Sequence, residues 1–533
     1  MVTTTIGKVS GEFFVTLRLN LLVCKIIRPD YYRNVVWSFL FKINKIKKYI
    51  MTKFNTTMTK AKTLTENLAG GQAYSQSDEL ALVSLLLTSF VNDQFYRNAQ
   101  TSLDELRKLS EKVKDKEFVA KAAIFARDRF GLRSITHALA GELTSQLSGA
   151  EWGKNFYDKV VVRVDDMTEI MSYYLAYKTS KDSPKFPNAL KKGFAKAFDK
   201  FDGYQLAKYK GDNKEVKLVD LVNIVHPIPT VRNKAALESL VKGELKNTQT
   251  WESMLSQAGQ VAESEEDLTK LKADAWSELI STKKIGYFAL LRNLRNIITQ
   301  SPTAVSSACE MLVDERLIKN SRVLPFRFST AYEEISKIGS SKEVRDVLMA
   351  IGQALDISVA NVPVFDGETL VVMDVSGSMS GKPSEIASLF GAILAKVNNC
   401  DVMTFSTDAK YMSYNPMDSV MTIRNSFRFS GGGTNFRSIF QKANKKYDNI
   451  IILSDLQGWV GYTTPSAEFN QYKSKFGANP YVYSWDLAGY GSLQFPEQNV
   501  FALAGFSDKV FDIIKLLKED KKALINEIKA IKI

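Results

Sequence analysis

The segment Leu370–Gly381 (LVVMDVSGSMSG) joins an apolar run to a loop of serine and glycine residues. The run ends at Asp374, and Ser376 and Ser378 follow at alternate positions before a stretch with apolar residues at helical spacing. In open α/β sheets, ligand sites are formed by polar loops that connect the carboxyl end of a buried strand to the following helix. Carboxylate and hydroxyl oxygens suit Mg²⁺, which takes six oxygen ligands at about 2.0–2.1 Å. The segment therefore predicts a divalent-cation site, with Mg²⁺ as the expected ion.

The spacing of these three residues is a D-x-S-x-S motif, which resembles the metal-ion-dependent adhesion site of von Willebrand factor A domains. In that family a threonine on a later loop and an aspartate after a later strand complete the site. This chain has Thr434 in SGGGTNF and Asp455 at the end of the apolar run NIIILSD. The resemblance implies one metal site, with an open position for an acidic group, formed by Asp374, Ser376, Ser378, Thr434 and Asp455.

Two other interpretations of these residues are a serine-rich turn that caps a helix and a hydrolase that uses two aspartates. A phosphoaspartate enzyme needs a second carboxylate two residues after the first, where this chain has Ser376. The chain has only two histidines, His137 and His226, and no nucleophile–base pair is recognisable. We therefore predict a binding protein without catalytic residues.

The composition is that of an ordinary globular protein of 533 residues, with 45% hydrophobic and 24% charged residues. This length is enough for two or three domains. The cysteines at 24, 309 and 400 lie far apart without a CxxC pair, which excludes a disulfide framework and a zinc site and favours a reducing cytoplasm. Residues 1–62 contain 12 Lys and Arg but only two acidic residues, so they carry most of the net charge of +13.

Residues 1–58 are predicted to form a basic N-terminal extension. Its apolar run Phe13–Ile27 is interrupted by two basic residues, so it is too short and too charged to span a bilayer, and it has no small-residue cleavage site. One interpretation is an amphipathic membrane-surface segment. The interpretation we favour is that translation begins at Met51 or Met58. Since no other spanning segment is recognisable, we expect a soluble protein without a membrane partner.

Residues from about 66 to 352 read as a long series of helices. Apolar residues recur at helical spacing in successive segments, and prolines stand at the breaks between them. This pattern predicts a degenerate helical-repeat solenoid of the HEAT kind, which usually serves as a binding scaffold.

The lysine-rich part of this region is residues 184–229. Three phenylalanines at helical spacing should face the core: Phe194, Phe198 and Phe201. Lysines recur on the opposite face and in the next turn: Lys192, Lys196, Lys200, Lys208 and Lys210. The ordinary interpretation of such a helix is a solvated charged face, and the functional interpretation is phosphate binding.

Several segments resemble the TROVE module of the Ro ribonucleoprotein autoantigen family, in its bacterial or phage form. They are FPNALKKG, QLAKYK and HPIP in the lysine-rich part, then FVAKAAIFARDRFGLR (Phe118–Arg133), ALLRNLRNI (Ala289–Ile297) and SRVLPFRF (Ser321–Phe328). The resemblance covers about residues 65–533. It implies a TROVE domain at 59–362 and a von Willebrand factor A-like domain at 363–533.

The fold implied by this resemblance is an α-helical HEAT-like repeat ring plus a C-terminal α/β von Willebrand factor A-like domain. The outer surface of the ring would bind small noncoding Y-like RNA, and its central hole would accept the single-stranded 3′ ends of misfolded RNA. Bacterial relatives associate with the exonuclease polynucleotide phosphorylase, so the resemblance implies this enzyme as a partner and a role in RNA quality control. We expect a monomeric, cytoplasmic protein.

Residue by residue, the resemblance assigns Lys208 and Lys210 of the KYK turn and His226 of the HPIP turn to contacts with Y-like RNA. The family's second basic position after KYK falls near Asp212, a departure that would alter the affinity for Y-like RNA or the geometry of the contact. For His226, a neutral imidazole that caps the preceding helix is the alternative role.

Arg292 and Arg295 lie three apart on one predicted helical face and would line the hole, since arginine suits phosphate and stacked bases. Without the resemblance, buried ion pairs would be the better interpretation. The complete set predicted to bind RNA is Lys192, Lys196, Lys208, Lys210, His226, Arg292 and Arg295.

Beyond Gly352 short β-rich runs alternate with helical ones, which predicts a mostly parallel, doubly wound sheet. We expect strands at 370–373, 402–405, 411–414, 450–453, 481–485 and 500–503, with 411–414 as an antiparallel edge. Helices are expected near 384–397, 435–446, 467–476 and 507–518, and a closing helix at 518–532. The alternative function is a metal-dependent protein-recognition scaffold. RNA binding would weaken with salt, whereas binding of a partner's carboxylate through the metal would disappear with a chelator.

Overall fold

The computed structural model describes residues 64–533 except 76, 90–97, 179–184, 212–213, 247–250, 322, 324, 360–361, 363, 461–464, 491, 495–498, 506–509, 512–513 and 515–522. The predicted basic extension, Asp212 and most of the helix expected at 507–518 lie outside the described residues. Within the described residues, no helix combines the length and the apolar character needed to cross a membrane.

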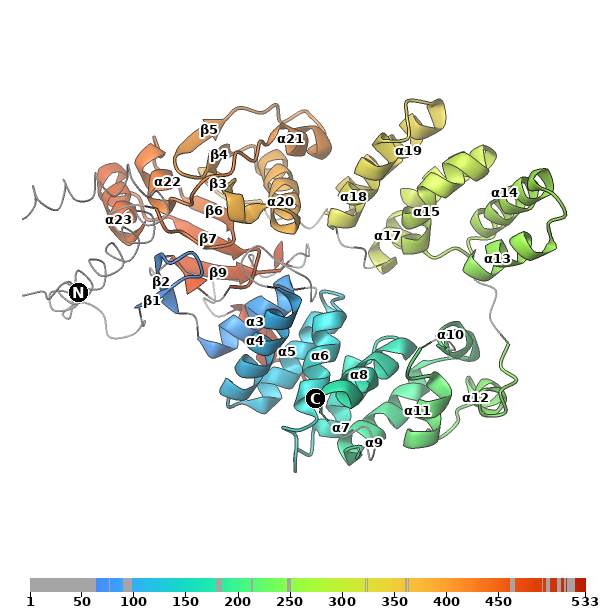
Figure 1. Ribbon diagram of the computed structural model, residues 1–533. Helices are drawn as coiled ribbons and strands as arrows, with labels where there is room; N and C mark the ends of the chain where they lie inside the picture. The colour runs from blue at the N-terminus through green and yellow to red at the C-terminus, as the bar shows by residue number, and fades with distance from the viewer. Residues whose placement is uncertain are drawn as a thin grey trace, which may run out of the picture. The chain divides into compact units, whose positions relative to one another are not determined.

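The described part of residues 78–358 is built from helices, as predicted (Figure 1). Short polar side chains begin many of them: Ser77 accepts a hydrogen bond from the backbone N–H of Leu80, and Asp115 accepts one from that of Phe118. The helices are α3 (Asp78–Thr88), α4 (Ala99–Lys112), α5 (Lys116–Asp128), α6 (Ser134–Leu143), α7 (Gly153–Val160), α8 (Val164–Tyr177), α9 (Asn188–Ala197), α10 (Gly203–Lys208), α11 (Leu218–Val225), α12 (Lys234–Val241), α13 (Trp251–Val261), α14 (Glu265–Ser281), α15 (Tyr287–Gln300), α16 (Val305–Leu312), α17 (Glu315–Ser321), α18 (Pro325–Ser336) and α19 (Lys342–Ser358).

Neighbouring helices of this region pack in pairs, including α7 with α9, α13 with α14 and α18 with α19. The phenylalanines predicted to face the core, Phe194, Phe198 and Phe201, are buried. The ring of Phe194 meets that of Tyr157 edge to face, with their centroids 5.7 Å apart. Burial of these rings fixes α9 against α7 and turns its lysine face outward, as the sequence indicated.

The C-terminal region contains a six-stranded sheet with the order β5-β4-β3-β6-β7-β9. All neighbours are parallel except β5 and β4, so the predicted antiparallel edge strand is confirmed. That strand begins two residues earlier than predicted, directly after the turn in which Ser406 N–H donates to the carbonyl of Asp408. The strands are β3 (Thr369–Asp374), β4 (Asp401–Phe405), β5 (Ala409–Met412), β6 (Asn449–Ser454), β7 (Tyr481–Asp486) and β9 (Val500–Ala504).

Helices cover both faces of this sheet (Figure 1). Because successive side chains of a strand point to opposite faces, each strand contributes to the core on both sides. Val371 and Met373 belong to one core cluster with residues of α20 (Lys382–Asn398), whereas Leu370 and Val372 belong to another with residues of α22 (Phe436–Lys442) and α23 (Pro465–Phe476). Burial on both faces explains why the strands read as continuous apolar runs.

A second, three-stranded sheet was not predicted from the sequence. It has the order β1-β2-β8 and consists of β1 (Leu64–Glu66), β2 (Gln72–Ser75) and β8 (Ser492–Leu493). Such short strands leave no clear periodicity in a sequence. The described residues also include α21 (Val420–Ser426), which was not predicted either, and α25 (Ala523–Lys529), which lies in the closing segment and packs on α5.

Candidate functional site

The five residues of the predicted metal motif lie on three loops at the carboxyl edge of the six-stranded sheet. Asp374 is the last residue of β3, and Asp455 directly follows β6. Because β3 and β6 are parallel neighbours, their carboxyl ends bring these two carboxylates together. Ser376 and Ser378 lie in the loop after β3, and Thr434 lies just before α22.

Hydrogen bonds hold the first loop in a fixed conformation around Asp374. The backbone N–H of Ser376 donates to Asp374 Oδ1 at 2.9 Å, and Ser454 Oγ donates to Asp374 Oδ2 at 2.6 Å. The hydroxyl oxygens of Ser376 and Ser378 are 3.3 Å apart. The two serines therefore present their oxygens on the same side of the loop as the carboxylate.

The loop that carries Thr434 is bonded to both of the others. Gly377 N–H donates to the carbonyl of Gly432 at 3.1 Å, and Trp459 N–H donates to the carbonyl of Thr434 at 3.1 Å. Gly432 has a φ of +90°, a left-handed conformation that favours glycine and lets the two loops approach closely. The structure thus unites all five predicted residues in one region.

The electrostatics of this region are dominated by two neighbouring buried carboxyl groups. Asp374 and Asp455 are fully buried, and Asp455 Oδ2 has no hydrogen-bond partner among the described residues. Burial raises the pKa of both carboxyls, and the charge of Asp374 raises that of Asp455 further. Two adjacent buried carboxylates are costly without a positive charge, so the residues fit a divalent metal.

The donor set also limits which metal fits. No group of three or more His, Cys, Asp or Glu side chains that would suit a metal occurs in the part of the chain that the structure describes. A cation here would therefore combine two carboxylates with hydroxyl oxygens, and hard oxygen ligands of this kind favour Mg²⁺ over zinc.

The lysines predicted to bind RNA differ in whether their ammonium groups already interact with another group of the protein. Lys192 and Lys196 both lie on the exposed side of α9, but Lys196 Nζ is 3.6 Å from Asp158 Oδ2. Lys208 is exposed, and its Nζ lies 5.9 and 5.6 Å from the ring centroids of Tyr204 and Tyr209.

Lys210 and His226 are the other two residues predicted for this surface. Lys210 Nζ donates to the carbonyl of Leu245 at 3.1 Å. His226 ends α11 in a left-handed conformation, with φ +49°, and its backbone N–H donates to the carbonyl of Val222 at 2.9 Å. The cap is thus made by the backbone of His226, and its exposed imidazole remains on the surface.

Arg292 and Arg295 are exposed on α15, so neither takes part in the buried ion pairs that were the alternative interpretation. Arg292 lies 5.8 Å from the ring centroid of Phe288, a side chain that is 40% exposed. The guanidinium of Arg327 approaches the same ring at 5.7 Å and also lies 4.9 Å from the ring of Phe326. Burial and then the charge of Arg292 lower the pKa of Arg327.

We call Phe288, Phe326, Arg292 and Arg327 the arginine–phenylalanine cluster. Lys382, the first residue of α20 after the metal loop, adds an ammonium 4.1 Å from the Phe326 ring. Sequence reasoning missed Phe288, Phe326, Arg327 and Lys382 as candidate site residues. The segment SRVLPFRF contains two of them and was noted only as a family match.

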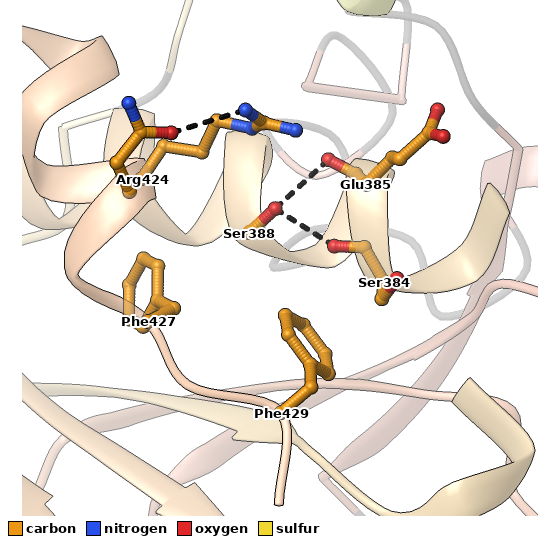
Figure 2. Close-up of a pocket in the computed structure, with 7 residues that line it drawn as sticks. Ser384, Glu385, Ser388, Arg424, Phe427 and Phe429 are labelled. Carbon is orange, nitrogen blue, oxygen red and sulfur yellow. Dashed lines mark hydrogen bonds between the residues drawn. The ribbon is translucent and has the colours of Figure 1, made fainter. Parts of the chain in front are cut away.

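A separate cavity of about 210 Å³ lies beside the first turn of α20 and is lined by Phe427 and Phe429 (Figure 2). Several of its polar groups are already bonded within the protein. Ser388 Oγ donates to the carbonyls of Ser384 and Glu385 at 2.7 and 3.1 Å. Arg424 forms an ion pair with Glu333 of α18 at 2.5 Å. We assign no ligand to this cavity.

Comparison with known proteins identifies the helical region. The family model of the TROVE domain matches residues 49–270 and 241–349, which is more than half of the chain. The chain belongs to the TROVE domain family.

Curated relatives of this TROVE protein match it over limited lengths. Telomerase protein component 1 of Mus musculus is 25% identical over 345 residues, which cover 49% of this chain and 13% of the mouse protein. RNA-binding protein RO60 of Deinococcus radiodurans is 25% identical over 217 residues, which cover 36% of this chain and 41% of that protein. The chain thus matches less than half the length of either relative.

The crystal structure of the Ro (RSR) protein of Deinococcus radiodurans is similar in fold, with a TM-score of 0.54 and 17% identity over 85% of this chain and all of that one. The predicted fold class, HEAT-like helical repeats followed by a von Willebrand factor A-like domain, is confirmed.

One TROVE segment noted in the sequence has a structural role. Arg127 and Arg133, from FVAKAAIFARDRFGLR, both contact the buried carboxylate of Asp166 on α8, at 2.9 and 3.4 Å. His137 Nε2 lies 2.9 Å from the same carboxylate, and the backbone N–H of Arg163 donates to it at 2.8 Å. We call these residues the Asp166 network, and it ties α5, α6 and α8 together.

Proposed function

We propose that this TROVE protein is a non-catalytic RNA-binding scaffold. It binds small noncoding Y-like RNA on the lysine-bearing surface of α9–α11 and single-stranded 3′ ends of misfolded RNA through α15. The observation that carries the proposal is the arginine–phenylalanine cluster, in which two guanidinium groups converge on one exposed ring. Family membership and a relative named as an RNA-binding protein support the same ligand class.

The chemistry of the cluster suits single-stranded RNA better than a protein ligand. The 40% exposed ring of Phe288 offers a surface on which a base can stack, worth about 1–3 kcal/mol per base. Arg292 and Arg327 form no ion pair among the described residues, so both remain available to phosphate. Since every base has a stackable face, such a site is tolerant of sequence.

The lysine-bearing surface suits the structured part of an RNA. Lys192, Lys208 and His226 are exposed there, and their side chains reach phosphates without rearrangement. Lys196 and Lys210 would first exchange an existing partner for phosphate. We therefore expect Lys192 and Lys208 to contribute more affinity than Lys196 and Lys210.

The broader role we propose is RNA quality control in the cytoplasm, as a monomer that delivers RNA ends to an exonuclease such as polynucleotide phosphorylase. This role follows from the family resemblance. The metal site would hold Mg²⁺ through the two aspartates and the hydroxyls of the motif, and the bound ion would attract an acidic group of a partner.

A metal-dependent protein-recognition scaffold is the second candidate function. The observation that favours it is the grouping of the five motif residues on hydrogen-bonded loops, with the unpartnered Oδ2 of Asp455. In that case binding of the partner would require the ion, whereas binding of RNA would not.

The test is a fluorescence anisotropy titration with a labelled single-stranded oligonucleotide. F288A and R292A should each weaken binding about tenfold, because each removes one component of the cluster. The matched control is K319A, since Lys319 is an exposed cation of α17 already paired with Glu315 at 2.5 Å. Equal affinities of F288A, R292A and wild type would contradict the proposed site.

A further inference from the structure

The turn between β1 and β2, residues 67–71, lies against the loop that begins with the metal-motif residue Asp455. Asn67 is buried, and its Nδ2 donates to the carbonyl of Gly458 at 2.7 Å. The backbone N–H of Leu68 donates to Gln457 Oε1, also at 2.7 Å. These two bonds connect positions about 390 residues apart in the sequence.

Asn67 also fixes the conformation of its own turn. Its Oδ1 accepts hydrogen bonds from the backbone N–H groups of Ala69 and Gly71 at 3.1 and 2.9 Å. A Cβ on Gly71 would lie 2.0 Å from the carbonyl oxygen of Gly458, so only glycine allows this approach. The turn is therefore both rigid and in tight contact with the Asp455 loop.

The loop that receives these contacts has a conformation that needs support. Leu456 has a φ of +59°, a left-handed conformation that costs a residue with a Cβ about 1–2 kcal/mol. Its carbonyl accepts a hydrogen bond from Gln494 Nε2 at 2.6 Å. The next residue, Gln457, donates its backbone N–H to Asp455 Oδ1 at 3.2 Å and is itself bound by the turn. The turn thus acts on Asp455 through one intervening residue.

We propose that Asn67 is a positioning residue of the metal site: its turn holds residues 455–460 so that Asp455 and Thr434 face the cation together. Thr434 is included because the backbone N–H groups of Trp459 and Val460 both donate to its carbonyl, at 3.1 and 3.2 Å. The inference rests on the proposed metal site. Groups that orient metal ligands in this way are typically worth 10–100-fold in metal affinity.

The first experiment compares amide hydrogen exchange over residues 455–460 in the full-length wild-type protein and in N67A, without added metal. N67A should exchange about tenfold faster there, because the loop loses its hydrogen bond from Asn67 Nδ2 to Gly458. N67D keeps the oxygen that closes the turn and loses the donor to Gly458, so it should show the same increase. The control is L68A, whose side chain is 52% exposed and whose backbone bond to Gln457 is retained.

The second experiment is a calorimetric Mg²⁺ titration of the same proteins, with Trp459 fluorescence as a parallel signal. Trp459 is suited to this because it is 55% exposed and its ring lies against Gly433, next to Thr434. N67A should bind Mg²⁺ at least tenfold more weakly than wild type, and L68A should bind it equally well.

The two experiments separate the inference from the proposed metal site. Faster exchange together with weaker Mg²⁺ binding in N67A supports the inference. Unchanged exchange over residues 455–460 in both N67A and N67D overturns it, and so does unchanged Mg²⁺ affinity alongside faster exchange. Absence of Mg²⁺ binding by the wild type overturns the metal site and this role of Asn67 with it, while the exchange data still show whether the turn holds the loop.

Discussion

The metal-motif loops and the lysine-bearing surface of α9–α11 differ in how their polar groups are satisfied. In the loops, both aspartates are buried and every loop is bonded to another. On the helical surface, Lys192, Lys208 and His226 are exposed. The first arrangement suits a small cation in one fixed geometry, and the second suits a large flexible polyanion such as RNA. The comparison teaches that burial, more than charge, distinguishes the two kinds of site.

The largest expected effect concerns a buried polar group that binds no ligand. D166N should lower the free energy of unfolding by about 3–5 kcal/mol, because Arg127 would remain buried without its counter-charge. Denaturant unfolding followed by circular dichroism measures this. The control is E117Q, since the partly exposed pair of Glu117 and Lys121 should contribute only about 1 kcal/mol or less. A loss of similar size in both variants would contradict a special role of the Asp166 network.

The next effect tests whether the buried carboxylates need a cation. Mg²⁺ at about 100 times its dissociation constant should stabilise the wild type by about 2.7 kcal/mol, and a chelator should remove that gain. D455N should show no response, because it replaces the carboxylate that has the unpartnered oxygen. The control is D408N, an exposed carboxylate paired with Lys442. Thermal unfolding with and without Mg²⁺ measures the response. A full Mg²⁺ response in D455N would exclude this site.

The pH dependence of Mg²⁺ binding follows from the pKa values of the same carboxyls. Burial raises the pKa of Asp374 and of Asp455, so protons compete with the cation as the pH falls. Mg²⁺ affinity should therefore increase with pH, by about tenfold per pH unit where one proton is displaced. Calorimetric titrations at pH 6, 7 and 8 measure this. Affinity that is constant over this range would contradict the raised pKa values.

The smallest effect distinguishes two neighbouring lysines on α9. K196A should cost about 0.2–1 kcal/mol of stability, because Lys196 pairs with Asp158, whereas K192A should cost almost none. For RNA binding the order should reverse, with K192A weakening it more than K196A. Unfolding midpoints and RNA titrations of both variants measure this. An equal loss of RNA affinity in K192A and K196A would mean that the ion pair of Lys196 with Asp158 does not reduce binding of Lys196 to phosphate.

The grouping of the five motif residues could be predicted from the sequence because most of them lie on loops that directly follow apolar strands. Asp374 and Asp455 each end such a run, and adjacent parallel strands bring them together. Asn67 gave no comparable signal, since a single asparagine in a turn contacts Gly458 without any periodicity that would link the two.

The helical region shows the same limit of sequence reasoning. The segment with Arg127 and Arg133 was recognised as a family feature, but its partner Asp166 lies 39 residues from Arg127 and had no distinguishing pattern. Likewise, the spacing of the lysines on α9 predicted an exposed face correctly. It could not show that Lys196 and Lys200 both lie close to Asp158, because that pairing depends on how α7 packs against α9.

The most direct test of the account is an RNA mobility-shift titration across a salt series, with and without a chelator. The probe is a stem-loop RNA with a single-stranded 3′ tail. We predict that affinity falls steeply with salt, with a slope set by the number of phosphates contacted, and that the chelator leaves it unchanged. Binding that is insensitive to salt and abolished by the chelator would contradict the account and favour the metal-dependent protein scaffold.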